Sequence, residues 1–215
     1  MTIHHSGIAG VREERRSRDR ELRRQDFLAA AERVFSRRGY HDAGMEEIAE
    51  EAGYAIGTVY RYFTSKKDLY HTLLETKAME QQQRLQGFLA MPGPVIERIR
   101  LLVHDELEFV RAHQEFLRVM VAEVMTNASD LNEGCRQLRA DHRRNFLRLI
   151  EEGQRSGEFP RVDKELASVL ISRMGETLFH EVLGVMPAGP AFDRKLAKVE
   201  AFMLEMIDRI LLPSP

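Results

Sequence analysis

The chain has 215 residues, 43% of them hydrophobic and 31% charged, a balance that excludes a wholly disordered protein and allows a buried core. Its formal net charge of −2 excludes a strongly basic or acidic protein, so bulk charge does not identify a partner. The single cysteine, Cys135, excludes an internal disulfide and is typical of a reducing compartment. The sequence has no apolar run of the roughly 18 residues that a membrane helix needs, and no secretory signal pattern. We therefore expect a cytoplasmic protein without a membrane partner.

The first segment, residues 1–17, is polar and lacks hydrophobic periodicity, so we expect a largely disordered arm. Between Arg12 and Arg24 there are seven arginines and four acidic residues. A short basic arm of this kind can follow phosphates or enter a minor groove of DNA. The alternative is the solvated, frayed start of a helix.

Residues 18–72 have apolar residues at helical spacing, interrupted by glycines. The pattern predicts a first helix that ends near Gly39, a short second helix that ends at Gly53, and a very short third helix. Ser65, followed three residues later by Asp68, resembles a capping box and predicts the start of a fourth helix.

Longer helices are expected in residues 73–215, where prolines and glycines separate apolar periodic segments. The expected helices cover 95–113, 115–125, 130–153, 163–186 and about 192–210. No stretch has the period of two that is typical of a strand. The sequence thus predicts an all-α protein with an N-terminal three-helix domain over 18–72 and a C-terminal helical bundle over 73–215, joined by a continuous fourth helix.

The stretch from Gly39 to Leu74 predicts two short helices separated by a glycine-containing turn, which a helix-turn-helix requires. The second of these helices must present side chains to the major groove of DNA, and 56–63 is the candidate. Glycine allows close backbone approach, while hydroxyls and cations suit phosphates or base edges. The candidate DNA-binding residues are Gly57, Thr58, Tyr60, Arg61, Tyr62, Lys66 and Lys67. The alternative is an ordinary helical hairpin with aromatic residues in its core.

This segment resembles the DNA-binding domain of the tetracycline-repressor (TetR) family. The matching residues are Ile48-Ala49, Ala52-Gly53, Gly57-Thr58-Val59-Tyr60, Tyr62-Phe63, Lys66 and Asp68-Leu69. The resemblance implies that Tyr60 and Lys66 contact phosphates, that Thr58 contacts the groove, and that Val59 and Phe63 belong to the core.

Two positions depart from the family pattern. Gly44 stands where the family usually has a serine or threonine that caps the second helix. Tyr54-Ala55-Ile56 stands where the family often has Val-Ser-Lys. Both departures remove groups that could contact phosphates.

The resemblance further implies that residues 73–215 bind a ligand and dimerise, with the last two helices forming a four-helix interface between subunits. Apolar faces on those helices are compatible with a symmetric interface. The candidate interface residues are Met174, Leu178, Val182, Val199, Met203, Met206 and Ile210. The alternative is that these residues are buried within one subunit.

A ligand pocket is expected to combine adaptable apolar side chains with a few polar ones. The candidate lining residues are Phe109, Phe116, Met120, Phe146, Met174, Phe179 and His180. The alternative is that they simply fill the core.

No catalytic motif is complete: the segment from His180 to Gly184 begins like a zinc-protease motif but lacks the second histidine. We therefore expect no enzyme activity, no cofactor and no metal. The sequence predicts a homodimeric transcriptional regulator, a repressor that binds a palindromic operator in double-stranded DNA and is released by a small, largely apolar effector. The alternatives are a ligand-independent DNA-binding structural or cell-division protein with the same module, and a helical-bundle enzyme.

Overall fold

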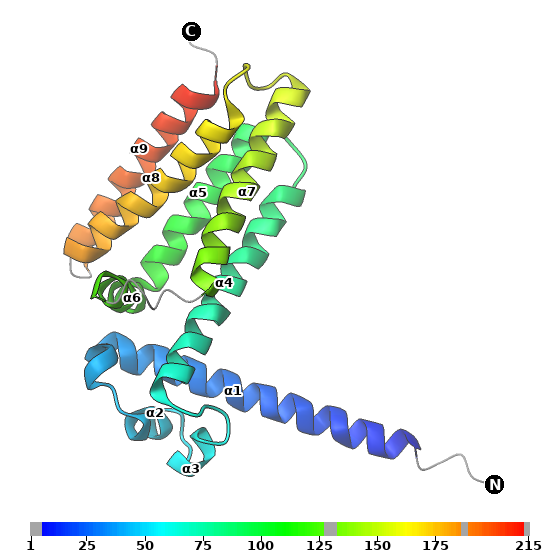
Figure 1. Cartoon of the computed structure of the whole chain (residues 1–215), viewed down its shortest axis with the longest axis vertical. Coiled ribbons are helices and arrows are strands. Elements are labelled where there is room, and N and C mark those ends of the chain that lie inside the picture. The colour runs from blue at the N-terminus through cyan, green and yellow to red at the C-terminus, as the bar shows by residue number, and fades with distance from the viewer. Residues whose placement is uncertain (1–5, 127–132, 186–188, 213–215) are drawn as a thin grey trace. The chain divides into compact units, whose positions relative to one another are not determined.

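The structure, a computed structural model, describes residues 6–126, 133–185 and 189–212. Within these ranges every regular element is a helix (Figure 1), which confirms the all-α expectation. The helices are α1 (Ser6–Asp42), α2 (Met45–Glu51), α3 (Ile56–Val59), α4 (Lys66–Ala90), α5 (Val95–Ala112), α6 (Gln114–Thr126), α7 (Glu133–Ser156), α8 (Lys164–Val185) and α9 (Pro190–Leu211).

The chain divides into two compact units, Met1–Leu74 and Glu75–Pro215. The boundary falls inside α4, so one helix contributes to both units. The first unit contains α1, α2, α3 and the start of α4. The second contains the remainder of α4 and the longer helices that follow it.

Helix α1 begins at Ser6, which differs from the disordered arm expected over residues 1–17. Arginine and glutamate are good helix formers, and this segment is rich in both. The side chains of residues 12–23 are exposed, so local propensity rather than burial explains the helix there. The helical backbone is interrupted at Gly39 (φ 76°, ψ 173°), near which the sequence predicted that the first helix would end.

The core of the first unit forms around Phe27 of α1, which is fully buried. Its ring centroid lies 4.9 Å from that of Tyr54 and 5.2 Å from that of Tyr62, both edge-on. Val59 and Phe63 are also buried, so the third helix is held against α1 by apolar side chains on one face. Burial of such side chains contributes about 1.5–3 kcal/mol each.

The second unit is a bundle in which α8 packs against α6, α7 and α9, while α5 packs against α7 and α9. The N-terminus of α5 follows Pro94, whose side chain cannot accept a hydrogen bond. The carboxylate of Glu158 accepts bonds from the backbone N–H groups of Val95 and Ile96 instead, both at 2.7 Å. A residue distant in sequence thus caps α5.

The apolar seam of α9 lies inside the core of its own subunit, which corrects part of the interface expected from the sequence. Val199 and Met203 are 5% and 2% exposed, and Val182 of α8 is 1% exposed. All three belong to one buried cluster with α5 and α7, so they have no surface to offer a partner. Met174, Leu178, Met206 and Ile210 are half-buried.

Candidate functional site

The segment from Met45 to Phe63 forms the expected helix-turn-helix. Helix α2 starts after Gly44, which provides no side-chain cap, and the turn contains Gly53 at φ 77°. Helix α3 ends at Val59, but the N–H groups of Tyr62 and Phe63 still donate to the Val59 carbonyl at 2.9 and 3.0 Å. The buried face of this segment fixes its orientation, so the other face points outward.

The outward face carries three of the candidate DNA-binding residues: Gly57, Tyr60 and Arg61 are exposed. Tyr60 keeps half of its surface accessible, at 50%. Thr58 is half-buried, and its hydroxyl accepts a hydrogen bond from the Arg61 guanidinium at 3.1 Å. A hydroxyl, a guanidinium and an open backbone therefore share one short surface, which suits contacts with phosphates and base edges.

Nothing within the described chain requires a glycine at position 57. A Cβ atom at this position would have no described neighbour within 4 Å, and its φ lies outside the left-handed region. Glycine in a helix is unfavourable by roughly 0.5–1 kcal/mol relative to alanine. The open space at Gly57 leaves room for a partner to approach the backbone closely.

Tyr62 has a mainly structural place, since it is half-buried and packs on Phe27. The guanidinium of Arg20 lies 5.9 Å from the centre of the Tyr62 ring. This contact brings the basic segment of α1 beside the end of the third helix.

Lys66 is held by the protein itself. Its Nζ donates to the carbonyl oxygens of His41 at 2.8 Å and Ala43 at 2.9 Å, and lies 5.0 Å from the centre of the Tyr40 ring. The side chain thereby ties the first turn of α4 to the connection between α1 and α2, a role that the sequence did not indicate. Lys67, in the same turn, is exposed.

The expected capping box at the start of α4 forms in altered form. The Asp68 N–H donates to the Ser65 hydroxyl at 3.1 Å, as expected. The Asp68 carboxylate accepts from the Thr64 N–H at 2.7 Å and the Thr64 hydroxyl at 3.0 Å, instead of from Ser65. The reciprocal bond has moved by one residue.

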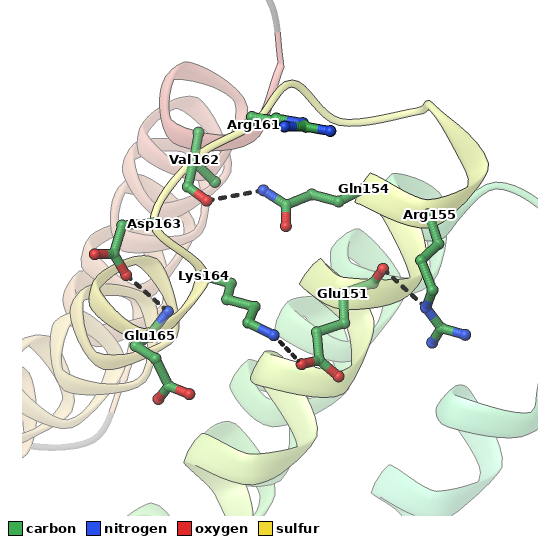
Figure 2. A pocket seen from close by; sticks show the side chains of 8 residues that line it. All are labelled: Glu151, Gln154, Arg155, Arg161, Val162, Asp163, Lys164 and Glu165. Carbon is green, nitrogen blue, oxygen red and sulfur yellow. Dashed lines mark hydrogen bonds and ion pairs between the residues drawn. The ribbon is translucent and has the colours of Figure 1, made fainter.

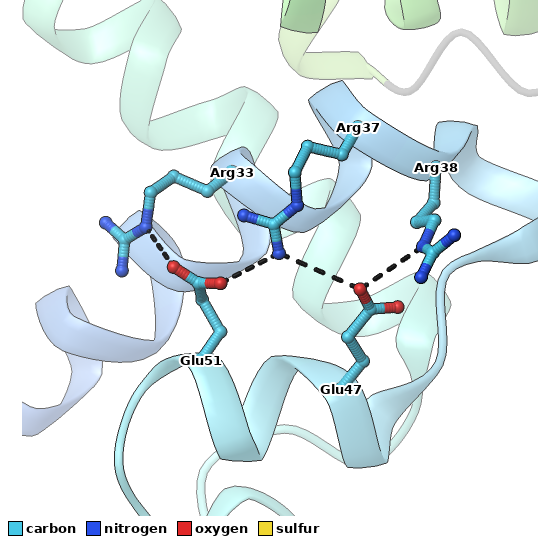
Figure 3. Close-up of polar contacts among 5 residues, drawn as sticks. All are labelled: Arg33, Arg37, Arg38, Glu47 and Glu51. Carbon is cyan, nitrogen blue, oxygen red and sulfur yellow. Dashed lines mark hydrogen bonds and ion pairs between the residues drawn. The ribbon is translucent and has the colours of Figure 1, made fainter.

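Five charged residues brace α2 against α1, and we call them the α1–α2 ion-pair cluster (Figure 3). Glu51 binds Arg33 at 2.6 Å and Arg37 at 2.8 Å, while Glu47 lies 3.7 Å from Arg37 and 3.3 Å from Arg38. The hydrogen bonds from Arg33 and Arg37 lower the pKa of Glu51, and the bond to Glu51 raises the pKa of Arg37. The cluster satisfies these arginines within the protein, and its exposure means that each pair contributes little stability.

The second unit contains a cavity of about 190 Å³ among α4, α5, α6, α7 and α8. Its lining consists of Gln81, Gln82, Leu85, Glu106, Phe109, Val110, Leu117, Met120, Val121, His142, Gly175, Glu176 and Leu183. Two of the candidate ligand-binding residues, Phe109 and Met120, are among them.

Two further candidates, Phe116 and Phe146, lie outside the described lining. Phe116 and Phe146 are buried at 1% and 2% exposure and do not belong to the lining, so they act as core residues. Met174 packs against the core next to Gly175 of the cavity. The side chains of Phe179 and His180 lie outside the described part of the chain.

The sequence analysis did not predict the polar residues of the cavity lining. His142 Nε2 contacts the carboxylate of Glu106, a side chain that is 7% exposed. Burial alone would lower the pKa of His142, but the charge and hydrogen bond of Glu106, with the charge of Glu176, raise it above its ordinary value. One signal was available: Glu106 falls among Leu102, Val103 and Val110, on the apolar face of its helix.

A second hollow lies where α7 ends and α8 begins (Figure 2), and most of its polar groups are bonded within the turn. The Gln154 amide donates to the carbonyl oxygens of Pro160 at 3.1 Å and Val162 at 2.8 Å. Lys164 pairs with Glu151, and Asp163 accepts from the Glu165 N–H at 3.1 Å. These bonds indicate that the residues stabilise the turn between α7 and α8.

The described residues contain no group of three or more His, Cys, Asp or Glu side chains placed to hold a metal ion. None of the described helices is both long and apolar enough to cross a membrane.

Comparison with known proteins connects both units to one family. Residues 27–73 match the family model of bacterial regulatory proteins, tetR family, and residues 92–180 match the tetracyclin repressor-like C-terminal domain. The transcriptional activator FasR of Mycolicibacterium smegmatis is 33% identical over 101 residues, which are 47% of this chain and 46% of FasR.

Solved structures share the fold. A TetR transcription regulator from Haloarcula marismortui aligns with a TM-score of 0.75 and 20% identity, over 89% of this chain and 99% of that one. The regulator FadR from Bacillus subtilis, solved in complex with stearoyl-CoA, aligns with a TM-score of 0.66 and 21% identity, over 85% and 96% of the two chains.

The fold and the helix-turn-helix define a DNA-binding transcriptional regulator with a C-terminal ligand-binding domain. The two family models together span more than half of the sequence, and the chain belongs to the TetR family. Members of this family bind operator DNA and typically dimerise.

Proposed function

We propose that this protein is a homodimeric repressor that places the third helix of each subunit in the major groove of a palindromic operator. The observation that carries the proposal is the outward face of the helix-turn-helix, where Gly57, Tyr60 and Arg61 are exposed while Val59 and Phe63 hold the helix in place. Two such helices in a dimer would lie about 34–36 Å apart, one turn of DNA.

We propose Gly57, Thr58, Tyr60 and Arg61 as groove or phosphate contacts. Tyr62 supports the core with its ring. Lys67 is exposed in the first turn of α4, where helix N-terminal amides also favour phosphate. For Lys66, the bonds to His41 and Ala43 favour an indirect effect on DNA binding through the position of α4.

The dimer surface that we propose is the outer face of α8 and α9. These helices pack against each other, and they carry three large apolar side chains that remain accessible: Leu166 at 62%, Leu170 at 59% and Phe202 at 48%. The half-buried Met206 and Ile210 of α9 remain candidates at its margin. Covering these side chains with a second copy would remove apolar surface from water, which favours association.

We propose that an effector in the 190 Å³ cavity favours a subunit arrangement in which the two third helices no longer match the operator. Such a ligand acts by its differential affinity for the two arrangements, with a typical coupling of about 1–3 kcal/mol. FasR is named as an activator, so the direction of control needs a separate readout. A reporter gene behind the operator should be silenced by the protein; stimulation would instead indicate an activator.

A selection from random-sequence DNA tests the proposal without knowledge of the operator. We expect enriched sites to contain inverted half-sites whose centres are about 10–10.5 base pairs, or a multiple, apart. Enrichment of single, unpaired half-sites would contradict the dimeric reading. Failure to enrich any sequence would contradict specific DNA binding.

A further inference from the structure

The cavity of the second unit has a charge pattern that restricts its ligand. Rather than a uniformly apolar lining, it has two carboxylates, Glu106 and Glu176, and one imidazole, His142. Among the described residues, no lysine or arginine belongs to the lining. Even with His142 protonated, the described lining therefore has a net charge of −1.

Two cations near the lining each pair with a carboxylate, although the buried Nη2 of Arg84 has no described hydrogen-bond partner. Arg84 stacks on Phe109 at 4.8 Å and pairs with Asp105 at 3.0 Å, while Arg173 pairs with Glu176 at 2.8 Å. An anionic ligand would thus meet carboxylates without a dedicated cation, and burying an unpaired charge is costly.

An acceptor in the lining also lacks a donor. Gln82 Oε1 is buried and has no hydrogen-bond partner among the described residues. Leaving a buried acceptor unsatisfied costs about 1–3 kcal/mol, so a ligand that brings an N–H group would remove this cost. The observation points to a donor in the ligand independently of the carboxylates.

The size of the cavity sets the scale of the ligand. Its volume is about 190 Å³, and an apolar cavity of about 150 Å³ can hold benzene. Phe109, Met120 and Leu183 provide apolar walls. One ring with a short polar substituent fits this volume.

We propose that the cavity binds a small organic cation, a protonated amine on an apolar body of about one ring, with its N–H groups directed to Glu106, Glu176 and Gln82. The proposal rests on the proposed function only in taking this occupant as the effector. The acyl-CoA class, suggested by the stearoyl-CoA bound to the FadR relative, is the competing outcome.

Isothermal titration calorimetry on the full chain, without DNA, tests the site with three matched probes. These are 2-phenylethylamine, 2-phenylethanol and 3-phenylpropanoate, followed by stearoyl-CoA. We expect the amine to bind at least about tenfold more tightly than the carboxylate, with the alcohol between them. Equal or tighter binding of the carboxylate, tighter binding of stearoyl-CoA, or no binding of the amine would overturn the proposal.

Two variants and a control assign the preference to the cavity. Glu176→Gln should weaken amine binding about tenfold and leave alcohol binding unchanged, because only the charged contact is lost. Glu106→Gln provides a second test of amine binding if Glu176→Gln does not fold. Glu181→Gln, an exposed carboxylate on the same helix, should change nothing. If Glu176→Gln and Glu106→Gln both keep the full amine preference, the assignment is overturned.

DNA titrations keep this proposal separate from the proposed function. Amine binding that leaves operator affinity unchanged would support the cation site and contradict its role as effector site. Operator binding by a chain that takes up no amine would contradict the cation site and leave the proposed DNA-binding function standing.

Discussion

Gly57 and Gly53 show how one residue type serves two purposes in the helix-turn-helix. Gly53 has φ 77°, which other residues adopt at a cost, so the turn itself requires it. Gly57 has an ordinary helical backbone and open space where a side chain would lie. The sequence placed both glycines correctly in the motif, but only the backbone angles distinguish the two roles.

Gly57→Ala should leave the fold intact and raise the free energy of unfolding by about 0.5–1 kcal/mol, because alanine is the better helix former. It should nevertheless weaken DNA binding, since the added methyl group faces outward. Urea unfolding and a DNA titration measure the two effects. Gly53→Ala is the control for the turn, with stability expected to fall by about 1 kcal/mol or more. DNA binding by Gly57→Ala at full affinity would remove this residue from the interface.

His142 makes stability depend on pH. Burial lowers the pKa of His142, but the charge and hydrogen bond of Glu106, with the charge of Glu176, raise it by more. The pKa in the folded state therefore exceeds the pKa in the unfolded state. The resulting stabilisation is fully present below the unfolded pKa of about 6.5 and is lost as pH rises through the folded pKa. Wild type should therefore lose stability relative to His142→Gln in urea unfolding as pH rises from about 6.5 through the folded pKa. A constant difference across this range would show that the pair does not titrate as described.

The starts of α5 and α9 were predictable because prolines mark them, Pro94 before α5 and Pro190 at the start of α9, whereas nothing of this kind marked the start of α1 at Ser6. The partner of an apolar face was not predictable in the same way. Periodicity shows that one side of α9 is buried, but not whether its own subunit or a second one covers it. Val199 and Met203 proved to belong to the core of their own subunit.

Contacts between residues far apart in the chain could not be predicted from the sequence either. The cap that Glu158 provides to α5 joins residues more than 60 positions apart, and the pairing of Glu106 with His142 spans 36 positions. Neither pair has a local spacing that would predict it. The cavity was therefore only partly anticipated, through Phe109 and Met120, because its polar lining depends on how α5, α7 and α8 pack.

Helix α7 is expected to tolerate no side chain at Gly153. A Cβ atom there would lie 2.2 Å from the Phe159 ring, so the ring or the helix must shift. Gly153→Ala should lower stability by about 1–3 kcal/mol, as overpacking does. Gly87→Ala in α4 is the matched control, since the space around it is open and alanine should stabilise the helix. Thermal unfolding compares the two; equal melting temperatures would contradict the close contact.

For the whole molecule, the accessible apolar side chains of α8 and α9 lead to a prediction about assembly. Leu170→Glu or Phe202→Glu should yield monomers in analytical ultracentrifugation, because a buried unpaired carboxylate opposes association. Met79→Glu, at a residue 65% exposed on α4, is the control and should leave the dimer unchanged. A persistent dimer in both α8 and α9 variants would place the interface elsewhere.

DNA recognition by the outward face of the third helix is the central claim, and a fluorescence-polarisation titration tests it most directly. Wild type, Tyr60→Ala and a Leu101→Ala control from the second unit would be titrated against the selected operator at two salt concentrations. We expect tight binding that weakens with salt, at least about a tenfold loss in Tyr60→Ala, and no change in the control. Operator binding by Tyr60→Ala that equals wild type at both salt concentrations would contradict the claim.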